Sequence, residues 1–406
     1  MITKPHLQRI FFLDYLRAFL VCLVVLDHAM HAYALHFGFA WFLPDFDRTT
    51  FFDVLHMHND SFMMPALFFL AGLFVIPSLQ RRGYLNFVKE RAVRLGIPFI
   101  LGVVFITPLL TYPKYLTFQN PNIDYWTYVT TIFVNTPQAG PFWFLYYLLL
   151  LSGIALIIYA VFPKFYHLLG ILCQKFIDRP LMGVAVVMLI GACLIGASDI
   201  KWGPHGWIGY GKLFYVRGSR FLFKGFLFFL GIGFSGCHLL QNQTAWQRLD
   251  VHWKQWTLLA IFIGTVYITY ALSFFDEGAY NSDVARHLRT GGLWEEAWPI
   301  LQQTAPAILI RTTLLAMFIV AQIMAYLAIF HHFLNHESES WQSLAVSSYG
   351  IYLIHEPFVV WSHWFFYGTD VPTFMKFVLS GFGSLFISWA IVRHGLFKFP
   401  MARRIL

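Results

Sequence analysis

The chain has 406 residues, of which 58% are apolar and 12% are charged, and its mean hydropathy is +0.61. A soluble domain carries about 25% charged residues, so this composition excludes a cytosolic enzyme, and the 45 phenylalanines exclude a disordered chain. The net charge of +8 does not predict a nucleic-acid partner, because basic residues at the inner ends of membrane helices account for it.

Apolar runs of about 20 residues recur along the chain and predict an all-α, polytopic membrane helical bundle of about ten transmembrane helices. A further apolar segment, 165–177, is interrupted by charges and is expected at the membrane interface. We treat 1–406 as a single membrane domain with its core at about 11–395. The predicted spans are 11–34, 62–79, 95–112, 142–162, 181–198, 221–240, 256–274, 306–330, 343–366 and 374–395.

The positions of Lys and Arg predict that the N-terminus and the C-terminus are both cytoplasmic. In this orientation the basic run from Arg81 to Arg94 lies inside, and more than half of the acidic residues lie outside. The longer connections, 35–61, 113–141, 199–220 and 275–305, are then also outside. We therefore expect chemistry that faces the outer side of the membrane.

The first predicted span carries five ionisable residues, which are costly inside a membrane unless they are paired or hydrated. Arg17 and His28 are eleven residues apart, so they share one helix face and stand about 16.5 Å apart along the axis. Asp14 is placed to pair with Arg17. The alternatives are that Arg17 snorkels to the interface and that His28 is a packed core histidine. The remaining ionisable residues of this span are Asp27 and His31.

The inner end of the third span carries Arg91 and Arg94, which are three residues apart and therefore neighbours on a helix. Their positions fit the positive-inside rule. They also suit an anion or phosphate site, because the guanidinium group binds such groups through a fork of donors. Arg17 enters from the same side of the membrane, so we expect that the three side chains could converge.

The ninth span places His355 and Glu356 side by side deep in the membrane, followed by Pro357, which loosens the helix. A neutral histidine beside a carboxylate is a plausible general-base unit. By helix rise, His355 lies about 18 Å into the span, at a depth comparable with that of His28. We therefore expect His28 and His355 to face one cavity.

Other polar and aromatic residues have simpler interpretations. Trp143 marks the outer end of the fourth span and fits the aromatic belt, Tyr349 fits helix packing, and Lys224 and Arg311 could snorkel or line a cavity. The chain has no HExxH, P-loop, GxSxG or meaningful GxGxxG motif. We predict no metal site, although metal spacing is conceivable for the four residues assigned to the first outer loop, Asp53, His56, His58 and Asp60.

Several short motifs occur together in a fixed order: L-D-Y-L-R-A with Arg-x10-His, M-P-A-L-F-F-L-A-G-L-F, an arginine pair before a proline, F-W-F-L, and Y-L-I-H-E-P. In this order they resemble the acyltransferase 3 family of integral membrane acyltransferases, over about residues 11–395. Within it they are similar to the branch that succinylates periplasmic glucans. We expect a membrane-only form, without the esterase domain that some members carry.

The resemblance implies transfer of an acetyl, succinyl or similar group from cytoplasmic acyl-CoA to a hydroxyl of an extracytoplasmic glycan or related acceptor, in a bacterial inner membrane. The other partner is the lipid bilayer. His28 would be the general base, or would carry the acyl group itself. The remaining roles are CoA binding by Arg17, Arg91 and Arg94, orientation of the base or acceptor by His355 and Glu356, support of Arg17 by Asp14, and substrate contacts by Trp143 and Tyr349.

Two other classes of function remain open from the residues alone. A proton-coupled transporter or exporter could use His28, His355 and Glu356 as a proton relay. Such a relay does not need the cytoplasmic arginine cluster, which favours the acyltransferase. A non-catalytic membrane subunit is disfavoured by the number of intramembrane charges.

Overall fold

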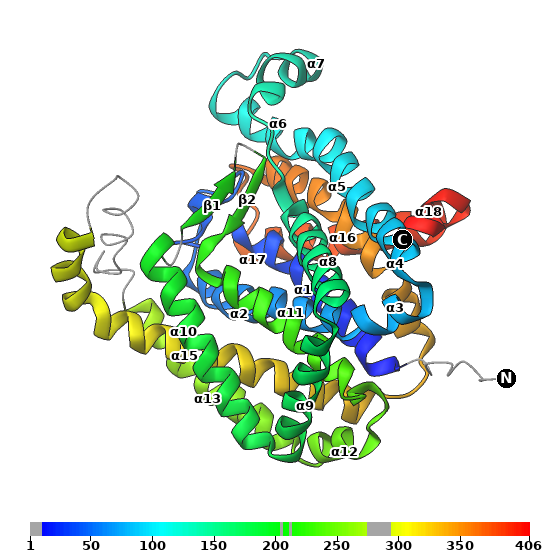
Figure 1. Ribbon diagram of the computed structural model, residues 1–406. Helices are drawn as coiled ribbons and strands as arrows, with labels where there is room; N and C mark the ends of the chain where they lie inside the picture. The colour runs from blue at the N-terminus through cyan, green and yellow to red at the C-terminus, as the bar shows by residue number, and fades with distance from the viewer. Residues whose placement is uncertain (1–9, 204–205, 211–212, 274–293) are drawn as a thin grey trace.

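The computed structural model describes residues 10–203, 206–210, 213–273 and 294–406 (Figure 1). Most of the predicted outer connection 275–305 lies outside these residues. The described chain is helical almost throughout, which confirms the all-α prediction. A short antiparallel hairpin lies within the predicted loop 199–220, and its strands β1 (Trp207–Tyr210) and β2 (Phe214–Arg217) pair Trp207 with Arg217 and Tyr210 with Phe214.

The ten predicted spans all fall on helices of the described chain. The third falls on a continuous helical run in which α4 (Tyr84–Arg91), α5 (Ile97–Leu101) and α6 (Thr107–Phe118) are joined by π-helical turns at Ala92–Gly96 and Gly102–Ile106. The others fall on α1 (Phe11–His31), α2 (Thr50–Leu73) with α3 (Val75–Arg82), α8 (Trp143–Val161), α10 (Pro180–Trp202), α11 (Phe221–Gly236), α13 (Trp253–Leu272), α15 (Trp294–Leu334), α16 (Glu339–Phe366) and α17 (Thr373–Ala390).

Shorter elements complete the described chain. The predicted interfacial segment 165–177 forms the amphipathic helix α9 (Pro163–Asp178). The other helices are α7 (Tyr125–Thr127), α12 (Gln243–Val251) and α18 (Pro400–Ile405). Two further π-helical turns lie at Tyr128–Ile132 and Ile391–Gly395. Short 3₁₀ turns lie at Gly38–Ala40, Phe133–Asn135, Gly140–Phe142, Gly218–Arg220, Leu239–Gln241 and Leu396–Lys398.

Seven helical stretches among the described residues are long and apolar enough to cross a membrane. They are Thr50–Arg82, Tyr84–Phe118, Tyr125–Val161, Pro180–Trp202, Trp253–Leu272, Ala305–Leu334 and Thr373–Lys398. The structure is therefore a polytopic helical bundle, and the count of ten crossings stays a prediction. Among the helices that carry predicted spans, α1, α11 and α16 do not meet these length and composition criteria. Two of them, α1 and α16, carry His28, His355 and Glu356.

Helix α1 occupies the centre of the bundle and packs against α2, α15, α16 and α17 (Figure 1). Its apolar side chains, such as Phe12, Leu20 and Val25, are almost completely buried between these neighbours. A helix with several charged residues can occupy this position because the surrounding helices, and not lipid, form its environment. The last turn of α1 therefore lies inside the protein.

Two glycines set the close crossing of α2 and α11. A methyl group added at Gly231 would come within 2.3 Å of the carbonyl oxygen of Phe69, and one added at Gly72 would come within 2.0 Å of the carbonyl oxygen of Phe228. Small residues at membrane helix crossings let the backbones approach. This crossing holds α2 against the bundle core.

The connection 32–49 folds over the C-terminal end of α1 and is attached at both ends. The carboxylate of Asp53 in α2 accepts hydrogen bonds from the backbone amides of Leu35, His36 and Phe37 at 3.0–3.1 Å. The ammonium group of Lys376 in α17 binds Asp45 at 2.9 Å, and both side chains are buried. The connection is thus a structured cover over the end of α1.

The prediction that 35–61 is an outer loop is wrong in its second half. Helix α2 begins at Thr50, where the Thr49 hydroxyl accepts the Phe51 amide hydrogen at 3.3 Å and caps the helix. The residues assigned to the loop, Asp53, His56, His58 and Asp60, are therefore helical. Their polarity concealed the helix start in the sequence, because in the fold their polar groups find partners inside the protein.

Candidate active site

His28 and His355 form a hydrogen-bonded pair in the interior of the bundle. His28 lies in the last turn of α1, and His355 lies in the middle of α16, which packs along α1. The distance from His28 Nδ1 to His355 Nε2 is 3.0 Å, and the rings are stacked with centroids 5.2 Å apart. His355 is completely buried, whereas the His28 side chain is 21% exposed. The two histidines therefore meet, as expected, whereas a cavity that both of them face stays a prediction.

The backbone of α16 fixes which nitrogen atoms carry hydrogen. His355 Nδ1 lies 2.9 Å from the carbonyl oxygen of Tyr352 and 3.2 Å from that of Ile351. A carbonyl oxygen only accepts, so Nδ1 of His355 must donate, and Nε2 of the neutral ring is left as an acceptor. His28 Nδ1 then donates to it. The free lone pair of the neutral His28 ring is therefore on Nε2, pointing away from His355.

Glu356 contacts the pair from the His28 side. Its Oε1 atom lies 4.0 Å from His28 Nδ1, and the carboxyl group is buried. Among the described residues, Oε2 forms no hydrogen bond. An ionised carboxylate at this distance would stabilise a protonated His28 ring. The carboxyl group is thus placed to act on His28 more directly than on its neighbour His355.

A second polar cluster lies next to this pair on the same turn of α1. His56 Nδ1 in α2 lies 3.1 Å from Asp27 Oδ2, and His31 Nδ1 lies 4.0 Å from the same oxygen. The His31 and His56 ring centroids are 4.0 Å apart. The sequence listed Asp27 and His31 as intramembrane ionisable residues but placed His56 in a loop. The spacing of four residues between Asp27 and His31 was the available signal.

Trp41 connects the two groups of histidines. Its ring centroid is 5.4 Å from that of His28 and 5.2 Å from that of His31, and it stacks on His31. Its indole Nε1 donates to His363 Nδ1 at 2.8 Å, and His363 Nε2 donates to the Ala29 carbonyl at 3.0 Å. Sequence reasoning missed Trp41 and His363, because neither belongs to a motif and only the folded connection brings Trp41 over α1.

The three arginines predicted to converge separate into two groups. Arg94 lines an open pocket of about 380 Å³. Arg91 instead lies over the Phe87 ring at 5.0 Å, and Arg17 pairs with Asp14 at 3.3 Å. The predicted Asp14–Arg17 pair is confirmed, whereas Arg17 and Arg91 do not line the pocket with Arg94. The pocket is lined by Arg82, Asn86, Lys89, Glu90, Val93, Arg94 and Arg404.

Tyr349 links this pocket to the helix that carries His355. Its hydroxyl donates to the backbone carbonyl of Arg94, within the π-helical turn between α4 and α5. π-Helical turns occur frequently at functional sites. Tyr349 precedes His355 by six residues on α16, which corresponds to about 9 Å of helix rise. Tyr349 therefore lies toward the pocket, and a substrate contact by it stays a prediction.

The other singled-out residues form contacts of their own. The ammonium group of Lys224 is buried and lies 4.5 Å from the centroid of the Trp143 ring, a cation–π contact. The guanidinium of Arg311 forms a buried ion pair with Asp199. Snorkelling therefore does not describe Lys224 or Arg311. Trp143 also contacts the rings of Phe68 and Phe144, each at a centroid distance of 6.4 Å, and stacking of a sugar ring on Trp143 stays a prediction.

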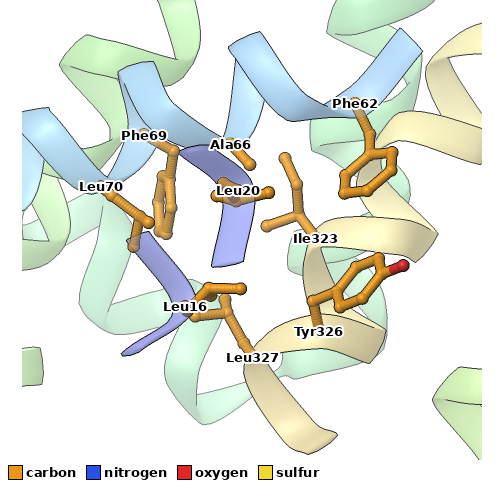
Figure 2. A pocket seen from close by; sticks show the side chains of 9 residues that line it. All are labelled: Leu16, Leu20, Phe62, Ala66, Phe69, Leu70, Ile323, Tyr326 and Leu327. Carbon is orange, nitrogen blue, oxygen red and sulfur yellow. The ribbon is translucent and has the colours of Figure 1, made fainter. Parts of the chain in front are cut away.

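A small closed cavity lies on the other side of α1, between α1, α2 and α15 (Figure 2). Its volume is about 10 Å³, and Leu16, Phe62, Ile323 and other apolar side chains point into it. A space of this size holds about one water molecule, and an apolar lining gives that water no partners. This cavity is therefore a packing defect and not a substrate site.

The structure is a polytopic helical bundle with a histidine pair in its interior and a basic pocket near one end. These features define the class as an integral membrane protein with ionisable side chains inside the bundle. A family model described as an acyltransferase domain matches residues 10–393. The chain therefore belongs to this family, the acyltransferase 3 family, and is a multi-pass membrane acyltransferase.

Individual relatives match over a shorter region. The glucans biosynthesis protein C of Salmonella gallinarum is 28% identical over 166 residues, which is 38% of this chain and 40% of the relative. The proteins of the same name from Salmonella typhi and Salmonella typhimurium are each 27% identical over 166 residues. The chain thus spans 40% of the length of the curated relatives that it matches. No solved structure matches.

Proposed function

We propose that the protein transfers an acetyl, succinyl or similar acyl group from a cytoplasmic acyl-CoA to a hydroxyl of an extracytoplasmic glycan or related acceptor, in a bacterial inner membrane. The observation that carries the proposal is the 3.0 Å hydrogen bond between His28 Nδ1 and His355 Nε2. This bond supplies a partly exposed imidazole, His28, of defined tautomer, with a lone pair on Nε2. Such a group is what acyl transfer to a hydroxyl requires.

The reaction uses His28 Nε2 as the general base. Nε2 takes the proton of the acceptor hydroxyl as the oxygen attacks the thioester carbonyl carbon. The carbon–sulfur bond then breaks, the ester forms, and the CoA thiolate receives the proton from His28. While His28 is protonated, the Nε2 acceptor of His355 and the carboxyl group of Glu356 stabilise it. Base assistance of this kind contributes about 10²–10⁴-fold to a rate.

The donor would bind at the cytoplasmic pocket. Four of its lining side chains are basic against one acid, Glu90. Arginine forks bind phosphate groups well, so Arg94 is the first candidate for the CoA phosphates. Arg17 and Arg91 would contribute positive charge at the same side of the membrane. The rise of about 9 Å from Tyr349 to His355 is shorter than an extended pantetheine arm, so a thioester bound in this way could reach the histidine pair.

The acceptor class is suggested by the relatives, whose printed name refers to glucan biosynthesis. A glucan offers many hydroxyl groups and flat sugar faces. Trp143 and the aromatic residues of the outer connections would provide stacking surfaces for it. This part of the proposal rests on the relatives and on residue type.

His28 could instead attack the thioester itself and carry the acyl group on Nε2 before passing it to the acceptor. The two routes differ in what they leave on the protein. Incubation with labelled acyl-CoA in the absence of acceptor, followed by acid quenching and peptide mass spectrometry, would show label on His28 only for the acyl-histidine route.

The central test has a chemical and a cellular arm. Purified protein in lipid nanodiscs is incubated with labelled acetyl-CoA or succinyl-CoA and an oligoglucan, and ester formation is followed by mass spectrometry. Cell-envelope glycans are compared with and without the gene. We expect an acyl ester in the first arm and a missing acyl mass in the second. If no ester forms, no thioester is consumed and the cell-envelope glycans are the same with and without the gene, the proposal is contradicted.

A proton-coupled transporter remains the competing function, since buried His and Glu residues also suit a proton relay. Nanodiscs carry no proton gradient, so a transporter would show no turnover of acyl-CoA in them. Transfer in nanodiscs therefore decides between the two functions.

A further inference from the structure

A group of metal-ligand type lies beside the histidine pair and has no part in the mechanism above. Asp27 and His31 are one turn apart on α1, and His56 faces them from α2. One ligand atom from each residue lies within 4.8 Å of the others. Asp27 and His56 are nearly completely buried, and the His31 side chain is 15% exposed. The cluster is therefore enclosed but reachable from one side.

The distances in this cluster suit a shared ion. Zinc–ligand bonds of about 2.0–2.2 Å in a tetrahedron separate neighbouring ligand atoms by about 3.3 Å. The Asp27 Oδ2 atom lies 3.1 Å from His56 Nδ1 and 4.0 Å from His31 Nδ1. These values bracket the tetrahedral separation, so binding requires only small side-chain movements.

The surroundings hold the rings in place. Trp41 stacks on His31 with an interplanar angle of 17°, and Phe37 contacts the edge of His56 at a centroid distance of 4.7 Å. Asp53 binds the backbone amide of Phe37 and so fixes that ring. Groups that orient the first ligands of a metal contribute strongly to its affinity.

The local charges also permit a cation. Asp27 brings a negative charge. Arg220, a buried cation in the 3₁₀ turn Gly218–Arg220 before α11 that interacts electrostatically with Asp27, is paired with Asp60 in α2. Its positive charge is therefore compensated. Two imidazoles with one carboxylate favour zinc or a similar transition metal over Mg²⁺ or Ca²⁺, which prefer oxygen ligands.

We propose that Asp27, His31 and His56 bind one divalent transition-metal ion of the zinc type. Three protein ligands leave a fourth position open, as in catalytic zinc sites. This assignment departs from the sequence expectation of no metal, because only the fold brings His56 to α1. If the proposed acyl transfer also holds, an acceptor hydroxyl bound at the open position would become more acidic next to His28; this consequence rests on the proposed function, whereas metal binding does not.

The test measures metal binding directly and does not depend on activity. Full-length protein is purified, stripped with a chelator and titrated with Co²⁺, and the visible absorption and the bound metal per chain are measured. We expect one Co²⁺ per chain with the intense absorption of tetrahedral cobalt, and displacement by Zn²⁺. Absence of a stoichiometric Co²⁺ spectrum in the wild-type protein would overturn the proposal, whatever any variant does.

Substitutions assign the ion to this cluster. His56→Ala and Asp27→Asn should each weaken Co²⁺ binding by at least about 10²-fold, because each removes a ligand or its charge. His58→Ala is the matched control, since His58 lies on α2 but bonds to Gln322 and Asn59 instead. Wild-type affinity in both His56→Ala and Asp27→Asn would contradict the assignment. Acyl transfer by the metal-stripped protein is measured separately. A protein that transfers acyl groups but binds no Co²⁺ would overturn the metal site and leave the proposed function standing.

Discussion

The hydroxyl of Tyr349 donates a hydrogen bond to the backbone carbonyl of Arg94, and this contact connects the basic pocket to the helix that carries His355. Helix α16 therefore has a pocket contact at one level and a histidine contact about 9 Å further along its axis. Because His355 on α16 is hydrogen-bonded to His28 on α1, helix α16 would fix the distance between a donor bound at the pocket and the base His28. The following predictions test the two ends of this arrangement and the packing that supports it.

His28→Ala should reduce acyl transfer by at least about 10²–10⁴-fold, because the substitution removes the proposed base. The measurement is ester formation from labelled acyl-CoA at saturating donor, with the protein level checked by immunoblot. His58→Ala, which changes a half-buried histidine of α2 that bonds to Gln322 and Asn59, should keep near wild-type activity. An active His28→Ala protein would remove His28 from the catalytic role.

His355→Gln and His355→Ala should separate positioning from chemistry. The Gln side chain can place an amide oxygen near the position of Nε2 and accept the hydrogen bond from His28 Nδ1, so it should retain part of kcat. The Ala variant should lose much more, with KM for the donor unchanged in both. Equal activity of the Gln and Ala variants would show that the hydrogen bond to His28 does not matter for the rate.

Arg94→Ala should raise the KM for acyl-CoA more than Arg91→Ala does, because Arg94 lines the pocket and Arg91 packs on Phe87. Arg94→Lys should have a smaller effect than Arg94→Ala, since it keeps the charge but loses the fork. Steady-state kinetics over a range of donor concentrations give these values. Unchanged KM in both Ala variants would leave these arginines as determinants of topology alone.

Gly231→Ala should destabilise the bundle by about 1–3 kcal/mol or more, because its new methyl group would overlap the carbonyl oxygen of Phe69 at 2.3 Å. Gly153→Ala in α8 meets nothing within 4 Å and should be neutral or slightly stabilising, since alanine favours the helix. Thermal unfolding in detergent, followed by a cysteine-reactive dye, compares the two. A Tm for Gly231→Ala equal to that of Gly153→Ala would contradict the close α2–α11 crossing.

Lys376→Met should lower the stability of the protein by about 3–5 kcal/mol, because it leaves the buried carboxylate of Asp45 without its partner. The double variant Lys376→Met, Asp45→Asn should recover part of this loss by removing the unpaired charge. Thermal unfolding of the three proteins forms a double-mutant cycle. A fully additive cycle would show that Lys376 and Asp45 do not interact.

The sequence by itself determined the membrane class, the placement of the predicted spans on helices, and the Asp14–Arg17 pair. These features depend on hydropathy and on residues three or four apart, which a helix places next to each other whatever surrounds it. The same reasoning predicted that His28 and His355 lie at a similar depth in the membrane, since helix rise converts residue number into distance.

Only the tertiary structure decided which side chains meet across helices. The tautomer of the histidine pair depends on the carbonyls of Tyr352 and Ile351, and the second cluster depends on His56 belonging to α2 and not to a loop. Trp41 reaches both groups because a folded connection, held by buried ion pairing at Asp45, covers the end of α1. Contacts between residues so far apart in the chain leave no periodic trace in one sequence, because they arise from packing between helices and not from the geometry of any single helix.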